Sequence, residues 1–188
     1  ALWTYVYLNM NFRYRHICNC EGLHMFPQYL QHTTSWGKAM QQRVLILGAR
    51  GRFGLAAARA FADAGWQVVG HMRPGAQVPK EMANDSRVAW VACDLHDVAA
   101  VAKAARAADV VVHALNPHYT NKAWKAEAMP LTEAAIEVTR ALGATLMFMG
   151  NIYNFGKDMP AMLREDTPQR AHTVKGQVRM AMEALIAQ

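Results

Sequence analysis

Short apolar runs alternate with segments of helical period along this chain from Met40 onward. Five runs rich in Val, Ile, Leu and Ala predict strands, at residues 44–47, 67–72, 88–92, 109–114 and 144–149. The segments between them predict helices, over 53–64, over 98–107 and over a long stretch that ends near 142–143. Strands that are apolar along their whole length are typical of a parallel sheet with both faces covered.

The alternation therefore predicts an α/β fold, a doubly wound parallel sheet of the Rossmann type. Because strand–helix–strand crossovers are right-handed, we expect helices on both faces and ligands at the carboxyl ends of the strands. A chain of 188 residues is long enough for one well-packed domain and too short for two comfortable ones. We assign residues 40–188 to this single domain.

The first part of the chain, residues 1–39, has another composition. It is poor in Ala and lacks the strand–helix alternation. We expect it to be an extension without its own fold, and Met40 to be the natural start. A metal site could be drawn in it from four residues, His16, Cys18, Cys20 and His24. Its Cys-x-Cys spacing differs from the Cys-x₂-Cys spacing of common zinc sites, so we predict no metal.

Composition excludes several functional classes. No run approaches the roughly 18 apolar residues that a membrane helix needs. The net charge of +6 comes from Lys and Arg spread along the chain, without the basic cluster that nucleic-acid binding needs. Three cysteines, two of them in the first twenty residues, predict no disulfide framework and favour the reducing cytoplasm. We predict a cytoplasmic protein without a nucleic-acid or membrane partner.

A glycine-rich loop follows the first predicted strand of the domain and opens a helix. Gly48 allows the tight turn, Gly51 lets the backbone approach a phosphate, and Gly54 lets helix and strand pack closely. The helix that begins near Arg52 and Phe53 directs its free N–H groups and its positive dipole end at the anion. The loop therefore predicts a dinucleotide site.

The end of the second strand indicates which dinucleotide is bound. An NAD site places an Asp or Glu there, which accepts a hydrogen bond from the ribose 2′-hydroxyl. This chain has no acid at that point and carries Arg73 instead. Arg73 and Arg50 can form charge-assisted bonds with a 2′-phosphate, so NADP is favoured and NAD stays open. Arg52 is expected either at the phosphate or on the solvated surface.

From about Arg43 to its last residue, the chain resembles the extended short-chain dehydrogenase/reductase superfamily, specifically the NAD(P)-dependent epimerase/dehydratase group. Residues 48–54 fit that family's Gly-x-x-Gly-x-x-Gly loop, and residues 151–156 resemble its segment ending in Tyr-Gly. The resemblance implies further cofactor contacts from the ends of the third and fourth strands, namely Asp94, Leu95, Leu115 and Asn116. In this family the Asp typically bonds the adenine amine.

The resemblance also implies a catalytic set, and this chain departs from it. The family uses a Ser or Thr after the fifth strand and a Tyr-x-x-x-Lys pair, in which the Tyr moves a proton. Alignment puts Asn151 at the Ser/Thr position, Lys175 at the Tyr and Arg179 at the Lys. Lys175 could act as an acid–base group if it were desolvated beside Arg179. Tyr153 and His172 are the other proton carriers nearby in sequence.

Two further interpretations of these residues stay open. Lys175 and Arg179 could instead form one solvated face of an ordinary helix, or bind cofactor phosphate and ribose without chemistry. Tyr153 could be a packed loop aromatic. Family members carry a further substrate-binding portion after the point where this chain stops, so we expect a fragment or a minimal cofactor-binding module.

The sequence thus supports two functions from different classes. The first is an NAD(P)-dependent oxidoreductase or epimerase that acts on an unknown small molecule. The alternative is a non-catalytic dinucleotide-binding sensor or regulatory module, which the three altered catalytic positions favour. The sequence leaves open whether the protein forms a homodimer.

Overall fold

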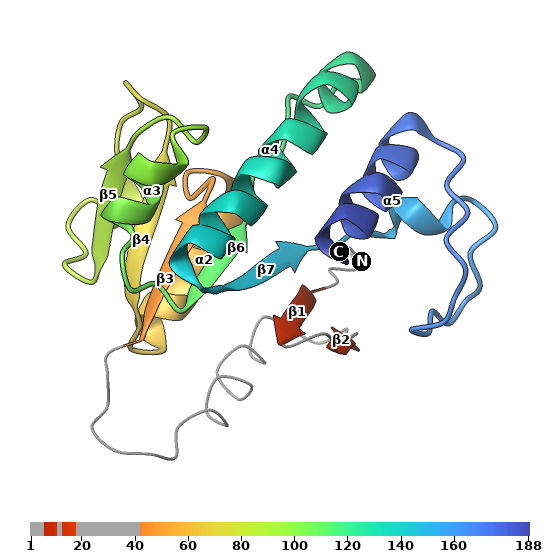
Figure 1. The fold of residues 1–188 in the computed structure, drawn as a ribbon, viewed down its shortest axis with the longest axis horizontal. Helices are drawn as coiled ribbons and strands as arrows, with labels where there is room; N and C mark the ends of the chain where they lie inside the picture. The colour runs from red at the N-terminus through yellow and green to blue at the C-terminus, as the bar shows by residue number, and fades with distance from the viewer. Residues whose placement is uncertain (1–5, 11–12, 18–41) are drawn as a thin grey trace.

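The computed structural model describes residues 6–10, 13–17 and 42–188, which form a twisted sheet with helices packed on both faces (Figure 1). Within these residues no helix is both long and apolar enough to cross a bilayer. The sheet of the described residues has seven strands in the order β2-β1-β7-β6-β3-β4-β5. Their bounds are β1 Val6–Met10, β2 Arg13–Ile17, β3 Arg43–Leu47, β4 Gln67–Met72, β5 Val88–Ala92, β6 Val110–His113 and β7 Thr145–Met149.

The strands from β3 to β7 are parallel and form the predicted doubly wound sheet. The chain enters at the centre with β3, runs through β4 to the edge strand β5, and then returns to the other side of β3 with β6. The direction of winding therefore reverses between β3 and β6. In open α/β sheets the ligand crevice lies at this switch point, outside the carboxyl ends of the strands.

The described residues also form four α-helices and two short 3₁₀ turns. Their bounds are α2 Arg52–Asp63, η3 Lys80–Met82, α3 Val98–Ala104, α4 Asn121–Leu142, η4 Ile152–Phe155 and α5 Val174–Ile186, of which η4 and α5 follow the last strand. Three of the helices begin at side-chain caps, since Asp97, Thr120 and Thr173 each accept a first-turn backbone N–H. Gly143 ends α4 in the left-handed conformation with φ of 62°, as the predicted stop near 142–143 requires.

The core lies in two layers, one on each face of the sheet. Along β3, Val44 and Ile46 pack with α2, whereas Leu45 and Leu47 pack with α3 and α4. Because successive side chains of a strand point to opposite faces, a strand covered on both sides must be apolar throughout. This explains the unbroken apolar runs in the sequence.

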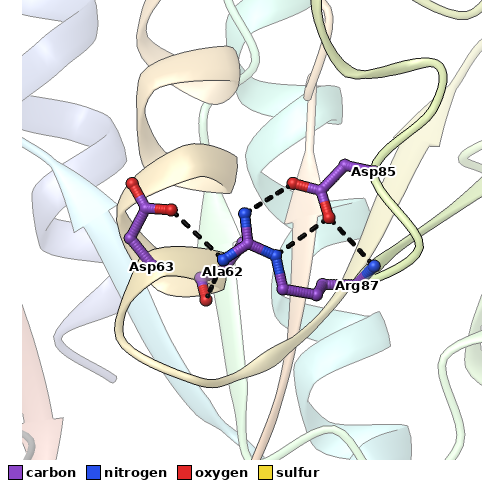
Figure 2. Close-up of polar contacts among 4 residues, drawn as sticks. All are labelled: Ala62, Asp63, Asp85 and Arg87. Carbon is purple, nitrogen blue, oxygen red and sulfur yellow. Dashed lines mark hydrogen bonds and ion pairs between the residues drawn. The ribbon is translucent and has the colours of Figure 1, made fainter.

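A cluster of polar contacts around Arg87 lies at the end of the sheet where the strands begin (Figure 2). Arg87 bonds Asp85 through Nη2 to Oδ2 at 2.7 Å, and its Nη1 donates to the carbonyl group of Ala62 at 3.0 Å. The same Nη1 lies 3.2 Å from Asp63. Hydrogen bonds from Arg87 lower the pKa of Asp85 to about 2. The cluster joins the C-terminal end of α2 to the segment before β5, away from the carboxyl edge.

The observed elements confirm the predicted fold with small shifts at their ends. The helix predicted over 98–107 ends earlier, at Ala104, and Ala107 adopts a positive φ of 61° that a helix cannot continue through. Within residues 1–39, β1 pairs antiparallel with β7 and with β2. That this extension contributes little to the fold stays a prediction, as does the start at Met40. Cys18, Cys20 and His24 lie outside the described residues.

Candidate functional site

The first glycine of the loop lies at the switch point of the sheet. Gly48 follows β3 with a φ of +81°, a conformation that other residues rarely adopt. A Cβ atom at this position would lie 2.9 Å from the carbonyl oxygen of Ala114 and 3.1 Å from the nitrogen of Leu115. The end of β3 and the end of β6 therefore meet across Gly48, and a side chain there would force them apart.

The third glycine joins helix α2 to the loop. A Cβ atom on Gly54 would overlap the carbonyl group of Gly48 and would lie 2.8 Å from the Cα atom of Ala49. Backbone hydrogen bonds close the same turn, from Gly51 to Gly48 at 3.0 Å and from Leu55 to Gly51 at 2.8 Å. Gly54 is thus required by the packing of the protein itself.

The middle glycine has no such packing reason. Gly51 is exposed, has an ordinary φ of −70°, and a Cβ atom on it would meet only the carbonyl oxygen of Gly48, at 3.4 Å. It is the N-cap of α2, where no side chain caps the helix and no acid lies in the first turn. The first-turn N–H groups of α2 and the positive end of its dipole therefore lie at an exposed, uncapped helix start. These residues fit a phosphate group.

The arginines of the proposed 2′-phosphate site lie at the neighbouring strand ends. Arg50 belongs to the loop after β3, and Arg73 follows β4 directly; both side chains are exposed. The N–H of Ala49 donates to the carbonyl of His71 at 3.3 Å, which ties the loop to the end of β4. Arg52 is exposed in the first turn of α2. Arg50 and Arg73 thus belong to the same edge.

The end of β5 supplies the residues expected beside the adenine. Asp94 is exposed and Leu95 is buried, and the carboxylate of Asp94 accepts the N–H of His96 at 3.0 Å. The ring of His71 is buried behind them, with Nε2 3.0 Å from the carbonyl oxygen of Cys93. Burial is the main cause that lowers the pKa of His71, so this ring is neutral at neutral pH.

The segment after β6 contributes Leu115, which is half-buried, and Asn116, which is exposed. Phe53 is half-buried and packs against the core layer formed with α2. With the glycine loop, these residues place every predicted cofactor-binding position after the carboxyl ends of β3, β4, β5 and β6, either on the following loop or in the first turn of α2.

The predicted catalytic residues come from the segments that follow β7. Asn151 caps η4, since its Oδ1 accepts the N–H of Tyr153 at 3.0 Å. The amide nitrogen of Asn151 can donate a hydrogen bond. Helix α5 packs tightly on this turn, because a Cβ atom on Gly176 would overlap the carbonyl of Tyr153.

Lys175 lies beside a tyrosine that the sequence analysis missed. Its Nζ donates to Oδ1 of Asn121 at 3.0 Å and lies 4.3 Å from the centre of the Tyr119 ring. The hydroxyl of Tyr119 lies 2.9 Å from the hydroxyl of Tyr153. Neither Tyr119 nor Asn121 belongs to a motif, and only their positions after β6, just before α4 and at its first residue, could have indicated them.

Arg179 is buried, with 2% of its surface exposed, so the alternative of a solvated helix face is wrong for this residue. Its Nη2 donates to the carbonyl oxygen of Met149 at 2.6 Å, and its guanidinium lies 4.5 Å from the centre of the Phe148 ring. The side chain thus connects α5 to the end of β7. His172 instead lies on the exposed loop, 3.6 Å from Asp158.

The sequence profile of the NAD(P)H-binding family matches residues 48–185 of this chain. No curated protein matches it. Among solved structures, it is similar to a UDP-galactose 4-epimerase, with a TM-score of 0.63 and 20% identity over 77% of this chain and 50% of that chain.

It is also similar to the Bordetella bronchiseptica enzyme WbmG in complex with NAD, with a TM-score of 0.64 and 18% identity over 79% of this chain and 50% of that one. The corresponding values for a UDP-N-acetylglucosamine 4-epimerase from Bacillus cereus are 0.64 and 11%, over 77% and 49%. The chain therefore spans about half the length of these structures. At these identities the likeness confirms the predicted fold.

Proposed function

We propose, from the premise that this chain belongs to the NAD(P)H-binding family, that it is an NADP(H)-dependent enzyme of the oxidoreductase or epimerase type. The observation that carries the proposal is the exposed, uncapped start of α2 at Gly51, at the switch point of the sheet. The protein does not need a glycine there for its own packing, whereas a phosphate that approaches the backbone does.

A bound nicotinamide dinucleotide would supply a hydride donor or acceptor at this edge. Gly51 and the first-turn N–H groups of α2 would hold the pyrophosphate. Arg50 and Arg73 would hold a 2′-phosphate, and the lack of an acid at the end of β4 favours NADP over NAD. Asp94 would bond the adenine amine, with Leu95 packed beneath it.

The acid–base part of the site would come from the segments after β7. The amide of Asn151 would donate a hydrogen bond to a substrate oxygen, in place of the hydroxyl that related enzymes use. Tyr153, with 39% of its surface exposed, presents a phenol that can give a proton. Lys175 is half-buried and engaged with Asn121, so we assign it a positioning role.

The alternative function is a dinucleotide-binding sensor without turnover. The buried guanidinium of Arg179 favours it, because Arg stands at the position of the family's catalytic Lys. This guanidinium donates a hydrogen bond to the carbonyl oxygen of Met149 at the end of β7. A sensor would bind the dinucleotide and change its contacts with a partner according to the cofactor state.

One experiment tests these two functions. The chain is titrated with NADPH and then mixed with NADPH and a panel of small carbonyl compounds, diacetyl among them, while cofactor oxidation is followed. A reductase binds NADPH and oxidises it only when a carbonyl compound is present. Binding without net oxidation by any compound of the panel would exclude a reductase of these compounds and leave the sensor, or an epimerase that returns its cofactor unchanged, and no binding would contradict both functions.

A further inference from the structure

Two tyrosine hydroxyl groups meet at the carboxyl edge of the sheet, and they come from different loops. Tyr119 lies between β6 and α4, and Tyr153 lies in η4 after β7. Their hydroxyl oxygens are 2.9 Å apart. Because β6 and β7 are parallel neighbours, both loops leave the sheet at the same edge. Gly48 contacts the end of β6 at this edge.

The ring of Tyr119 is held from two sides. Lys175 places its ammonium group 4.3 Å from the ring centre, within the range of a cation–π interaction, and Asn121 holds that ammonium group at 3.0 Å. Trp124 makes a T-shaped contact with the same ring, with the ring centres 6.4 Å apart. A side chain with 66% of its surface exposed would otherwise sample several rotamers. These contacts instead point its hydroxyl at Tyr153.

We propose that Tyr153 is the proton donor of this site and that Tyr119, held by Lys175, positions it and returns its proton. The proposal rests on the proposed function as an NADPH-dependent reductase. When a substrate carbonyl carbon receives a hydride, its C=O π pair moves to oxygen, and that oxygen takes the proton of Tyr153 as the phenolic O–H bond breaks. The Tyr153 phenolate then takes a proton from Tyr119, which regains one from water.

The environment of Tyr153 suits an acid. The hydrogen bond to Tyr119 is the main cause that raises the pKa of Tyr153, burial raises it further, and the charge of Arg179 opposes them. A phenol in this state keeps its proton at neutral pH and has it available for transfer. The exposed surface of Tyr119 gives the pair a route to solvent.

The test has one arm that does not depend on activity. NMR spectra of protein with isotope-labelled tyrosine are recorded against pH for the unaltered chain, Tyr119→Phe and Lys175→Met. We expect the pKa of Tyr153 to fall toward its ordinary value in Tyr119→Phe, because the main raising cause is lost. Lys122→Met, at an exposed lysine of α4, is the matched control for Lys175→Met and leaves the titration unchanged. An unchanged Tyr153 titration in Tyr119→Phe would overturn the pairing.

The second arm measures NADPH-dependent reduction of the carbonyl panel. Tyr153→Phe is expected to lower kcat by about a hundredfold or more, the scale of general acid catalysis, with NADPH affinity retained. Tyr119→Phe is expected to lower kcat by a smaller factor without raising KM. Equal losses in both variants would indicate a structural tyrosine pair, and full activity of Tyr153→Phe would remove it as the donor. No reduction by the unaltered chain would instead refute the reductase function, and the donor assignment with it.

Discussion

Gly176 of helix α5 packs directly against the carbonyl group of Tyr153, so that no side chain fits between the helix and η4. The contact sets the position of Tyr153 and also that of Lys175, the residue next to Gly176. A Cβ atom at Gly176 would further lie 2.8 Å from the Cβ atom of Ala171. The helix and two loops are therefore fitted to one another at a glycine.

Gly176→Ala is expected to destabilise the protein by about 1–3 kcal/mol, because overpacking moves backbone that cannot relax locally. Denaturant unfolding measures this loss. Gln177→Ala, at an exposed neighbour on the same helix, serves as the control and is expected to stay within about 0.5 kcal/mol of the unaltered chain. Equal stability of the two variants would show that α5 can move away from η4 without cost.

The glycines of the loop are expected to separate binding from folding. Gly51→Ala should leave the stability of the protein nearly unchanged, since its Cβ atom would meet a single oxygen at 3.4 Å, yet it should abolish dinucleotide binding. Gly54→Ala should instead destabilise the fold, because its Cβ atom would overlap the carbonyl of Gly48. Unfolding curves and NADPH titrations of both variants check this. Unchanged NADPH affinity in Gly51→Ala would contradict the phosphate site.

The sheet and the glycine loop could be predicted because they depend on local pattern. Apolar runs and the spacing of Gly48, Gly51 and Gly54 are visible within a few residues. The pairing of Tyr153 with Tyr119 could not be found in this way, because the two residues are 34 positions apart and Tyr119 belongs to no motif. The burial of Arg179 could not be predicted for another reason: a charged helix residue is normally solvated, and only the packing of α5 on β7 shows that this one is buried.

Stability is expected to depend on pH through a buried histidine. His113 is 2% exposed and contacts Thr132, and burial, with the charge of Arg179 adding, lowers its pKa to about 3. A depressed pKa means that the unfolded chain binds the proton more tightly. The stabilisation is therefore full above the ordinary pKa of 6.5 and is lost as the pH falls toward 3.

The slope of that loss is up to about 1.4 kcal/mol per pH unit for one proton. Denaturant unfolding across this interval measures it, in the unaltered chain and in His113→Gln, which keeps a polar partner for Thr132. In the variant, the free energy of unfolding is expected to depend less steeply on pH, by the contribution of one proton. Part of the pH dependence stays, because the pKa of His71 is also lowered. An identical slope in both proteins would mean that His113 is protonated in the folded state.

Limited proteolysis tests the prediction for residues 1–39. We expect cleavage to stop near Met40 and to leave a stable core, because residues 42–188 contain the whole parallel sheet and its helices. The trimmed protein should unfold at nearly the same denaturant concentration as the full chain. A core that unfolds once the extension is removed would show that the pairing of β1 with β7 is needed for the fold.

The most direct test of the proposed NADP(H) site is a calorimetric titration of the chain with NADPH and with NADH, repeated for Arg73→Ala. We expect NADPH to bind more tightly than NADH. Arg73→Ala should lose about 1.5–3 kcal/mol of NADPH binding, the scale of a hydrogen bond to a charged group, while NADH binding changes little. Equal losses for both cofactors would assign Arg73 to their shared pyrophosphate or to the fold. Failure of both cofactors to bind the unaltered chain would contradict the dinucleotide site itself.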